Sequence, residues 1–437
     1  MVRPVVLPLL VAAAILAACG EPPSAETGTS EPSTSAATTA PSPTTTAPST
    51  STSTTSSAST STTTPDPTTG AETTTTDATT SGTTDAASTS TASTTDATTG
   101  APCEGLECQV DPCGGDPKKT VLRGKVVAPE GTLPLYNVNV YVPNAPLAPL
   151  PEGVQCDTCA GLDGDPVVAA LTDTKGEFVL TGAPAGPQIP LVVAVGKWRR
   201  ESLVTVTACA DNLTPAEATR LPRNQSEGHL PKIALTTGGA DPLECLLHKL
   251  GVDEAEFTPP AGPGRVHLYA GAGGGADRFD KALNGGALFP KAPVLWDSLV
   301  TLMKYDLVLM ACEGNQYPDQ KSPTARQNLV KYAGVGGRLF FTHFHNVWIQ
   351  QGPAPWPTVA KFKFQADLPN PSTGTIDAGF PKGQALADWM VNVGGSQVAG
   401  AVALNEGQHT IDFFFNDTAT TEIYTEPPLP ASVQHLS

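Results

Sequence analysis

The sequence has few basic residues for its length. Among its 437 residues there are 25 Lys and Arg against 42 Asp and Glu, so the formal net charge is -17. Proteins that bind nucleic acids rely on Lys and Arg contacts to phosphate groups. We therefore expect this chain to have no nucleic acid partner.

The first residues lack an apolar run long enough to span a bilayer. A transmembrane helix needs about 20 apolar residues, whereas the run that follows Arg3 covers only residues 5–18. A basic residue followed by a short apolar run is typical of a secretory signal peptide. We therefore assign residues 1–18 to a signal peptide that is removed on export.

The apolar run ends in Leu16-Ala17-Ala18-Cys19, which resembles the lipobox of bacterial lipoproteins. The resemblance implies cleavage before Cys19 and acylation of its thiol, which makes the membrane a partner through the lipid. The residue after Cys19 is Gly20. In the sorting rule of bacterial lipoproteins an Asp at this position retains the protein in the inner membrane, so the resemblance implies the outer membrane or cell surface. The alternative is an ordinary signal peptide with a cysteine by chance.

Residues 20–102 contain no aromatic residue and consist almost entirely of Thr, Ser, Ala, Pro, Gly, Asp and Glu. Such a composition buries too little apolar surface to offset the entropy of ordering the chain. We therefore expect residues 19–102 to form a disordered stalk, and Ser/Thr-rich tracts with Pro resemble O-glycosylated stalks. A coil of about 80 residues spans on the order of 50 Å, enough to hold a folded part away from the membrane.

Nine cysteines are present, and eight remain when Cys19 is set aside. An even number in an exported chain is typical of disulfides, whose pairing the sequence does not select. Three lie in the Gly- and Pro-rich segment 103–119, which we interpret as a disulfide-stapled junction. Cys156 and Cys159 have the CxxC spacing of zinc or redox sites, but the loop-like sequence after them favours structural disulfides. The eight are Cys103, Cys108, Cys113, Cys156, Cys159, Cys209, Cys245 and Cys312.

Short β-rich runs broken by Pro and Gly begin at Thr120. Residues 138–142 alternate with period two, and a tight turn is expected at 173–176, where Gly176 supplies a positive φ. Several short strands at this spacing predict a β-sandwich. We assign it to residues 120–237.

Two segments of this region, LRGKVVAPEGTLPLYNVNVYV and TDTKGEFVLTGAPAG, resemble the carboxypeptidase regulatory-like domain. That family is a small prealbumin-like sandwich with a carbohydrate-binding-like fold. The resemblance implies that the T-D-x-x-G-x-F motif is a hairpin with Phe178 in the core. It also implies an accessory module without catalytic residues.

Trp198, Arg199 and Arg200 follow one of the expected strands and are the candidate ligand-binding residues. An exposed aromatic ring beside guanidinium groups suits sugar stacking or anionic glycans. The alternative is that Trp198 packs on the rim of the sandwich and the two arginines are solvated. Glycans or cell-envelope polymers are therefore possible partners under the first interpretation only.

A short helix is predicted from Asp241, which can cap it, with Pro242 in its first turn and Glu244 closing a capping box. We assign residues 238–263 to this helix and a linker. A buried strand at 265–269 then runs into a glycine-rich loop whose spacing does not fit a dinucleotide-binding motif.

Strands and helices alternate in the following region, at residues 264–412. Strands are predicted at 305–310 and 338–343, and amphipathic segments at 294–303 and 323–333. Such alternation predicts an α/β doubly wound parallel sheet. The fold class is therefore multidomain: a β-sandwich followed by an α/β doubly wound parallel sheet, after a long disordered stalk.

Active groups of parallel sheets lie at the carboxyl ends of the strands. Cys312 and Glu313 follow one predicted strand, and His343 and His345 lie at the end of the next. These four are the candidate catalytic residues, although a disulfide is the expected use of the Cys312 thiol, with Cys245 as one candidate partner. Two histidines at i and i+2 of a strand would face opposite sides, so we expect no metal site.

The segments RVHLYAG, YDLVLMACEGN and LVKYAGVGGRLFFTHFH resemble the class I glutamine amidotransferase-like fold. In that family the catalytic cysteine follows the strand after the Gly-Gly turn. His343 occupies that position here, and Cys312 lies one strand earlier. The resemblance therefore implies the fold without glutaminase activity.

The last residues carry an unusual signature. Residues 416–425 are the translation of an oligonucleotide that resembles a common sequencing adapter. We therefore expect residues 413–437 to be an assembly artefact and the α/β domain to be truncated near residue 412.

The function expected from these patterns is that of a surface-anchored lipoprotein with a non-catalytic recognition or structural role, with carbohydrate binding as one form of it. The alternative is a cell-envelope hydrolase or amidase that uses Cys312 and His343. We expect no cofactor.

Overall fold

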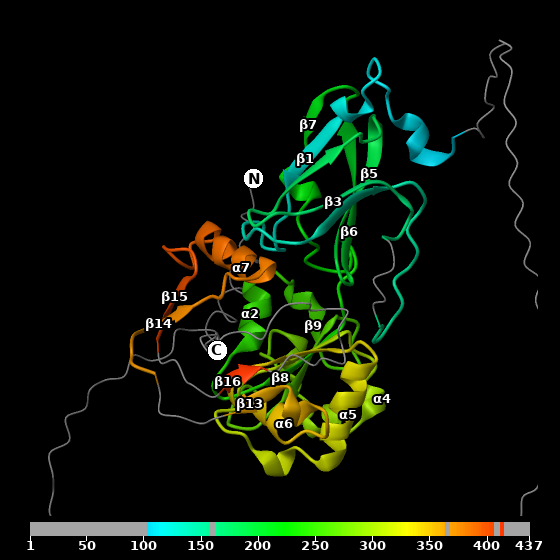
Figure 1. The fold of residues 1–437 in the computed structure, drawn as a ribbon. Helices are drawn as coiled ribbons and strands as arrows, with labels where there is room; N and C mark the ends of the chain where they lie inside the picture. The colour runs from blue at the N-terminus through cyan, green and yellow to red at the C-terminus, as the bar shows by residue number, and fades with distance from the viewer. Residues whose placement is uncertain (1–102, 157–161, 363–367, 406–410, 415–437) are drawn as a thin grey trace, which may run out of the picture. The chain divides into compact units, whose positions relative to one another are not determined.

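The computed structural model describes residues 103–156, 162–362, 368–405 and 411–414 (Figure 1). The predicted signal peptide with Cys19, the predicted stalk and residues 415–437 of the predicted artefact lie outside these ranges. Among the described residues, no helix is long and apolar enough to cross a membrane.

Two sheets form the first folded part. One has the order β4-β1-β7 and the other the order β3-β2-β5-β6. Buried side chains of both sheets belong to one cluster, including Leu122 of β1, Leu180 of β4 and Leu191 of β5, so the sheets share a core. The predicted β-rich architecture is confirmed here. The elements are η1 (Gly105–Gln109), η2 (Pro117–Lys119), β1 (Val121–Lys125), β2 (Asn139–Pro143), β3 (Pro166–Leu171), β4 (Glu177–Thr181), β5 (Gly186–Val195), β6 (Trp198–Val206), β7 (Asp211–Leu213) and η3 (Ala216–Ala218).

The turn before β4 has the expected geometry. The Asp173 carboxylate accepts hydrogen bonds from the backbone N–H groups of Lys175 and Glu177 at 2.9 and 2.8 Å. Gly176 has a φ of 76°, a left-handed value that favours glycine. Phe178, two residues on, is buried in the shared core, so the local chemistry of this motif fixes both the turn and the direction of the strand.

A five-stranded sheet with the order β12-β11-β8-β10-β9 forms the second part. Its pairings are all parallel. The central strand is β8 (Ile233–Thr237), which the sequence analysis had assigned to the sandwich. All five of its side chains are buried, which is typical of a strand covered on both faces. The other strands are β9 (Phe257–Thr258), β10 (Val266–Ala270), β11 (Leu307–Met310) and β12 (Arg338–Phe341).

Alternate residues of the central strands enter different apolar clusters. Ala234 and Val308 lie in one cluster with Trp296 and Leu329. Leu235 and Leu309 lie in the other, which also contains residues of α2 (Leu243–Lys249) and the segment after it. Both faces of the sheet are therefore covered by apolar layers.

The helices of this part agree with the sequence in one case and differ in two. The helix α5 (Pro323–Gly334) is capped by Ser322, close to the predicted bounds. The segment predicted at 294–303 instead forms two short helices, α3 (Pro293–Trp296) and α4 (Leu299–Leu302), because Ser298 caps the second. Asp241 does not cap α2; its carboxylate accepts a hydrogen bond from the backbone N–H of Cys312 at 3.3 Å.

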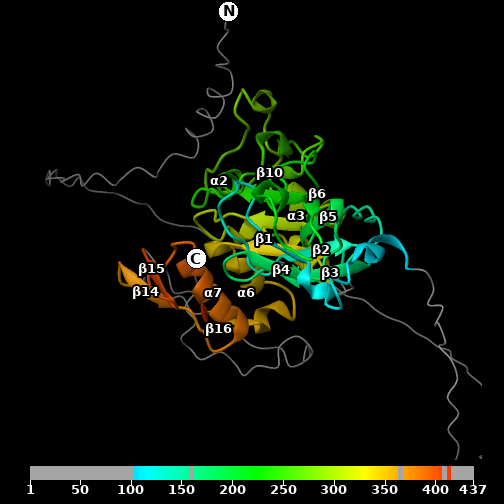
Figure 2. The same ribbon diagram turned by 90° about the horizontal axis from the view of Figure 1, so that it is seen from above.

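The remaining elements follow β12. In both Figure 1 and Figure 2, α7 lies beside the pair β14 and β15. The Phe413-Phe414 part of the predicted artefact lies at the end of β16, which pairs with β13. The elements are η7 (His343–Asn346), α6 (Val347–Gln350), η8 (Trp356–Thr358), β13 (Ala360–Phe362), β14 (Ser372–Thr375), α7 (Pro381–Asn392), β15 (Ala401–Leu404) and β16 (Ile411–Phe414); between earlier strands lie η4 (Glu254–Glu256), η5 (Asn284–Gly286) and η6 (Pro318–Gln320).

The cysteines are only partly used in disulfides. Cys113 is bonded to Cys209, and the junction also contains the pair Cys103–Cys108. The expectation that Cys312 forms a disulfide, with Cys245 as one candidate partner, is wrong: Cys312 is a free, buried thiol, and Cys245 is disulfide-bonded to another cysteine. Cys156 is a free, exposed thiol, and Cys159 lies outside the described residues.

Candidate functional site

The loops at the carboxyl edge of the parallel sheet pack closely on one another, and this explains their glycines. A Cβ atom on Gly238, after β8, would overlap the carbonyl oxygen of Cys312, after β11. A Cβ atom on Gly273, after β10, would likewise overlap the carbonyl oxygen of Glu313. The glycine-rich segment therefore serves close backbone packing, which brings the polar groups of three strand ends together.

Cys312 and His343 meet at this edge. Cys312 lies two residues after the end of β11, and His343 begins η7, two residues after the end of β12. The two strands are neighbours in the sheet. The Cys312 Sγ atom lies 3.3 Å from the His343 Nδ1 atom. The two residues that were predicted as the core of a catalytic site are thus in contact.

Several contacts stabilise negative charge on the Cys312 sulfur. Burial by itself raises the pKa of the thiol, but hydrogen bonds from His343 and from the backbone N–H groups of Phe344 and Gly314 outweigh it. The pKa of Cys312 is therefore held below its ordinary value. The Gly314 nitrogen lies 3.4 Å from the sulfur.

His343 lies on a strained turn between a strand and a helix. Its φ is 39°, in the left-handed region that few side chains other than Asn, Asp and His tolerate. Such strain occurs where the surrounding structure needs a particular side-chain direction. Residues 343–346 are helical rather than extended, so the expectation that His343 and His345 lie on opposite faces of a strand does not apply.

Glu313 forms a buried ion pair with Lys321, a residue that the sequence did not indicate as part of the site. The Lys321 ammonium lies 2.6 Å from a Glu313 carboxylate oxygen, and each of these side chains is 1% exposed. The other Glu313 oxygen accepts a hydrogen bond from the Ala272 N–H at 2.8 Å. Lys321 also lies 5.7 and 5.6 Å from the ring centroids of Trp296 and Trp348. The carboxylate is therefore neutralised and holds three loops together.

His345 is a buried, neutral side chain. Its Nε2 atom is 2.8 Å from the carbonyl oxygen of Ala311, and its Nδ1 atom accepts a hydrogen bond from the Trp348 indole. Burial first, and then the nearby charge of Lys321, lowers the pKa of His345 to about 3. Its bonding capacity is used by the protein, so it does not join Cys312 and His343 as a reacting group.

The candidate ligand-binding residues also make contacts inside the protein: Trp198, Arg199 and Arg200. The half-buried Trp198 ring packs against both the sandwich core and the adjoining cluster, and its indole N–H donates to Pro222. Arg199 forms an ion pair with Asp163 at 2.8 Å, and Arg200 donates to a backbone carbonyl. Of the two interpretations of Trp198, packing on the sandwich is the one that the geometry favours.

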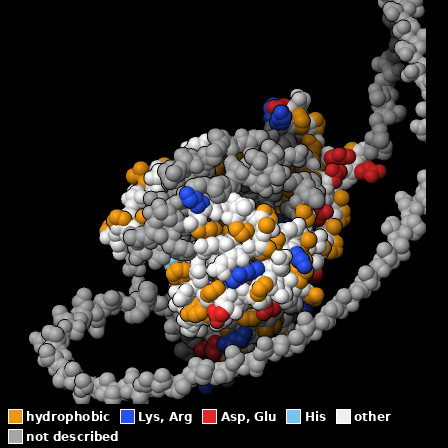
Figure 3. All heavy atoms as spheres, turned by 60° about the horizontal axis from the view of Figure 1, so that its bottom comes forward, with side chains coloured by type: hydrophobic (Ala, Val, Ile, Leu, Met, Phe, Trp, Pro, Cys, Tyr) orange, Lys and Arg blue, Asp and Glu red, His pale blue; other side chains and the backbone are white. Residues whose placement is uncertain are grey.

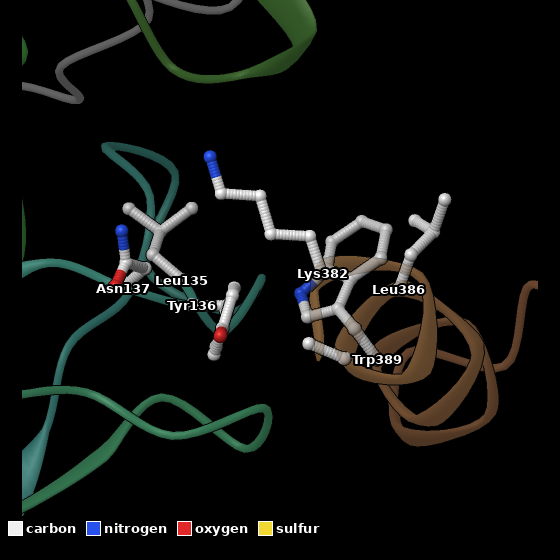
Figure 4. A pocket seen from close by; sticks show the side chains of 7 residues that line it. Leu135, Tyr136, Asn137, Lys382, Leu386 and Trp389 are labelled. Atoms are coloured by element: carbon white, nitrogen blue, oxygen red, sulfur yellow. The ribbon is translucent and has the colours of Figure 1, made fainter. Parts of the chain in front are cut away.

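A cavity of about 420 Å³ lies between the segment before β2 and helix α7 (Figure 4). In Figure 4, Tyr136 and Asn137 on one side face Lys382 and Trp389 on the other. The Trp389 indole N–H donates to the Pro134 carbonyl oxygen at 2.8 Å, which fixes the ring. Tyr136 is 41% exposed. Sequence analysis missed this site, although Pro381 and the apolar spacing that follows could have revealed the helix.

A second cavity, of about 430 Å³, lies beside the glycine-rich loop after β10. It is lined by that loop and by polar residues before α5, including Asp297, Gln320 and Ser322. Ser322 donates to Asp297 at 2.5 Å while it caps α5, so two of these groups are paired with each other. Neither cavity is lined by Cys312.

One group of metal-ligand residue types lies close together among the described residues: Asp111, Cys113 and Cys209. Its two sulfur atoms are joined in a disulfide. A disulfide offers no thiolate ligand, so this group does not fit a metal centre.

Comparisons with known proteins do not show a family. No protein-family model matches the chain, and no curated protein matches it. Among solved structures, the chain is similar to a chain of a type II cohesin–X-dockerin complex from Acetivibrio cellulolyticus, an interface mutant, with 16% sequence identity. The match covers 31% of this chain and 85% of that chain with a TM-score of 0.17, and at this score it carries no argument.

Proposed function

We propose that this chain is an envelope lipoprotein, acylated on Cys19, whose folded part binds a saccharide without cleaving it. The observation that carries the proposal is the cavity between Tyr136 and Trp389. The anchoring part rests on the lipobox-like end of the apolar run, and the recognition part rests on the chemistry of the cavity.

The cavity has the composition that sugar binding requires. Its volume of about 420 Å³ lies within the range of small-molecule sites, which are apolar with a few placed polar groups. The rings of Tyr136 and Trp389 offer apolar faces for the C–H groups of a sugar ring. Within the described structure, the Tyr136 hydroxyl and the Asn137 side-chain amide make no hydrogen bond to the protein, so both remain available to sugar hydroxyls.

This concentration of apolar groups differs from the face of the molecule that Figure 3 shows. Figure 3 shows the face at the bottom of Figure 1, where hydrophobic side chains are dispersed among polar ones. Four apolar residues, by contrast, line the cavity together with its polar groups: Leu135, Ala385, Leu386 and Trp389. Gathered apolar side chains with few polar partners are the better indication of a binding site.

Two observations support a binding role over the hydrolase alternative. Glu313 is neutralised by Lys321, and His345 is fixed by Ala311 and Trp348, so neither is available as a general base. Cys312 is 0% exposed and lines neither of the two cavities, so the described residues leave a polymeric substrate no open route to its sulfur. Nucleophilic catalysis on a polymer requires such a route.

We also propose that the two folded parts are related to the carboxypeptidase regulatory-like and class I glutamine amidotransferase-like families. The Asp173 turn with buried Phe178 supports the first relationship. The parallel strand order, covered on both faces, and the strained residue His343 at the position of the family's nucleophile support the second. A doubly wound α/β architecture belongs to the same proposal.

The test is saccharide binding by the full exported chain, first on an array of bacterial envelope and plant glycans and then by calorimetry. We expect Tyr136→Ala to weaken binding of the tightest oligosaccharide by about tenfold, the effect of losing one well-packed aromatic contact. Trp198→Phe is the matched control, because this indole is packed inside the protein, and its affinity should equal the wild type.

Two outcomes would contradict the proposal. The first is that no glycan binds to protein whose near-ultraviolet circular dichroism shows a folded core. The second is the reverse order of effects, with binding lost in Trp198→Phe and kept in Tyr136→Ala. Hydrolysis of a bound oligosaccharide or of glutamine that is abolished by Cys312→Ser would instead support the alternative of a hydrolase or amidase.

A further inference from the structure

Cys312 remains without a role in saccharide binding, although its surroundings are unusual for a structural thiol. It is a free cysteine in a chain whose other described cysteines, apart from Cys156, are disulfide-bonded. Its sulfur contacts the His343 imidazole at 3.3 Å and a backbone N–H at 3.4 Å. A thiol buried only for packing needs none of these polar contacts.

We propose that Cys312 and His343 form a thiolate–imidazolium pair that reduces small peroxides and is itself oxidised to a sulfenic acid. The His343 Nδ1 atom is placed to take the thiol proton. The N–H groups of Gly314 and Phe344 then face the resulting negative sulfur. Reactive cysteines have this combination of a neighbouring imidazole and donor groups.

The size of the reactant follows from burial. The Cys312 side chain is 0% exposed, and the half-buried His343 ring lies against its sulfur. A peptide, glycan or acyl ester therefore cannot reach the sulfur, whereas hydrogen peroxide has two heavy atoms and carries no charge. The geometry selects a small neutral oxidant over the acyl substrates of a thiol hydrolase.

The reaction balances with groups that are present. The thiolate sulfur attacks one oxygen of hydrogen peroxide, so that an S–O bond forms and the O–O bond breaks. The sulfur loses two electrons, and the peroxide gains them. The departing hydroxide takes the proton from the His343 imidazolium and leaves as water, which gives a sulfenic acid and a neutral imidazole.

Other charged groups near the sulfur are already paired. The Asp241 carboxylate accepts a hydrogen bond from the Cys312 backbone N–H. Glu313, the next residue, forms the buried ion pair with Lys321. His345 is neutral, with its pKa lowered to about 3. Of the groups that these elements bring to the sulfur, His343 is therefore the one that can exchange a proton with it.

The chain contains its own control thiol, because Cys156 is free and exposed. The full exported chain is treated with hydrogen peroxide at mildly acidic pH, and sulfenic acid is trapped with dimedone and located by peptide mass spectrometry. We expect trapping at Cys312 before Cys156, although Cys312 is the buried one. His343→Asn, chosen because Asn tolerates a left-handed φ, should slow the reaction at Cys312 on the order of a hundredfold.

A second measurement does not depend on access to the sulfur. In a Cys156→Ser background, the ultraviolet thiolate absorbance is titrated, and His343→Asn should move the titration of Cys312 to higher pH. Two results would overturn the proposal. One is faster oxidation of Cys156 than of Cys312 in the native chain. The other is that the wild type and His343→Asn show the same oxidation rate and the same thiolate titration of Cys312. Equal oxidation of both thiols after unfolding in guanidinium confirms that the reagents reach them. Saccharide binding does not involve Cys312, so the two proposals fail independently.

Discussion

At the scale of single residues, the ion pair between Lys321 and Glu313 is the feature that could not be predicted from the sequence. Glu313 was recognised because it follows a predicted strand, but Lys321 lies in an irregular segment without periodicity. A lysine is almost never fully buried unless it is paired with an opposite charge, and no local sequence pattern predicts such a buried pair. Cys312 and His343 were found because the carboxyl ends of neighbouring parallel strands lie at one edge, a rule that needs no side-chain detail.

Removal of one partner of this pair should be strongly destabilising. Lys321→Met leaves the Glu313 carboxylate buried at 1% exposure without a counter-charge, and such changes cost about 3–5 kcal/mol. Denaturant unfolding of the variant should show this loss. The matched control is Lys331→Met, on the exposed side of α5, which should change the free energy of unfolding by less than about 0.5 kcal/mol. Equal effects of the two substitutions would mean that the buried pair is energetically unimportant.

At the scale of elements, some strand, turn and helix positions followed from the local sequence pattern, whereas the pairing of the strands did not. The bounds of α5 and the Asp173 turn agree with the sequence, because Ser322, Pro323 and Gly176 act within a few residues. The five buried residues of β8 fell inside the range 120–237 that was assigned to the sandwich. Only long-range pairing with β10 and β11 makes it the centre of the parallel sheet.

The disulfides of the junction offer a comparison of two loop lengths. Cys113 and Cys209 are 96 positions apart, whereas Cys103 and Cys108 are 5 apart. In the chain-entropy description the long loop contributes about 4–5 kcal/mol and the short one about 2 kcal/mol. We therefore expect the double variant Cys113→Ser/Cys209→Ser to lower the free energy of unfolding more than Cys103→Ser/Cys108→Ser. Denaturant titration of both variants decides, and the opposite order would refute a mainly entropic contribution.

At the scale of the whole molecule, the proposed binding site joins parts of the chain that no local pattern connects. Pro134 and Trp389, whose hydrogen bond fixes one wall of the cavity, are 255 positions apart. The sequence analysis therefore placed its binding candidates at Trp198, where an aromatic residue and two arginines are adjacent in the chain. Adjacency along the chain selected residues that the fold uses for its own packing, and the spatial neighbours emerged only from the tertiary structure.

Anchoring at Cys19 would determine where this binding operates, and it can be tested directly. One acyl chain gives only marginal membrane binding, whereas two or more give stable attachment, so acylation of Cys19 should place the whole chain in the membrane fraction. Cells that express the wild type in the presence of labelled palmitate should incorporate label into the protein, and Cys19→Ala should abolish both the label and the membrane association. The matched control is Cys156→Ser, which removes the free, exposed thiol and should keep both. Equal labelling of the Cys19→Ala and wild-type chains would reject the anchor, and the folded part would then be released rather than held at the surface.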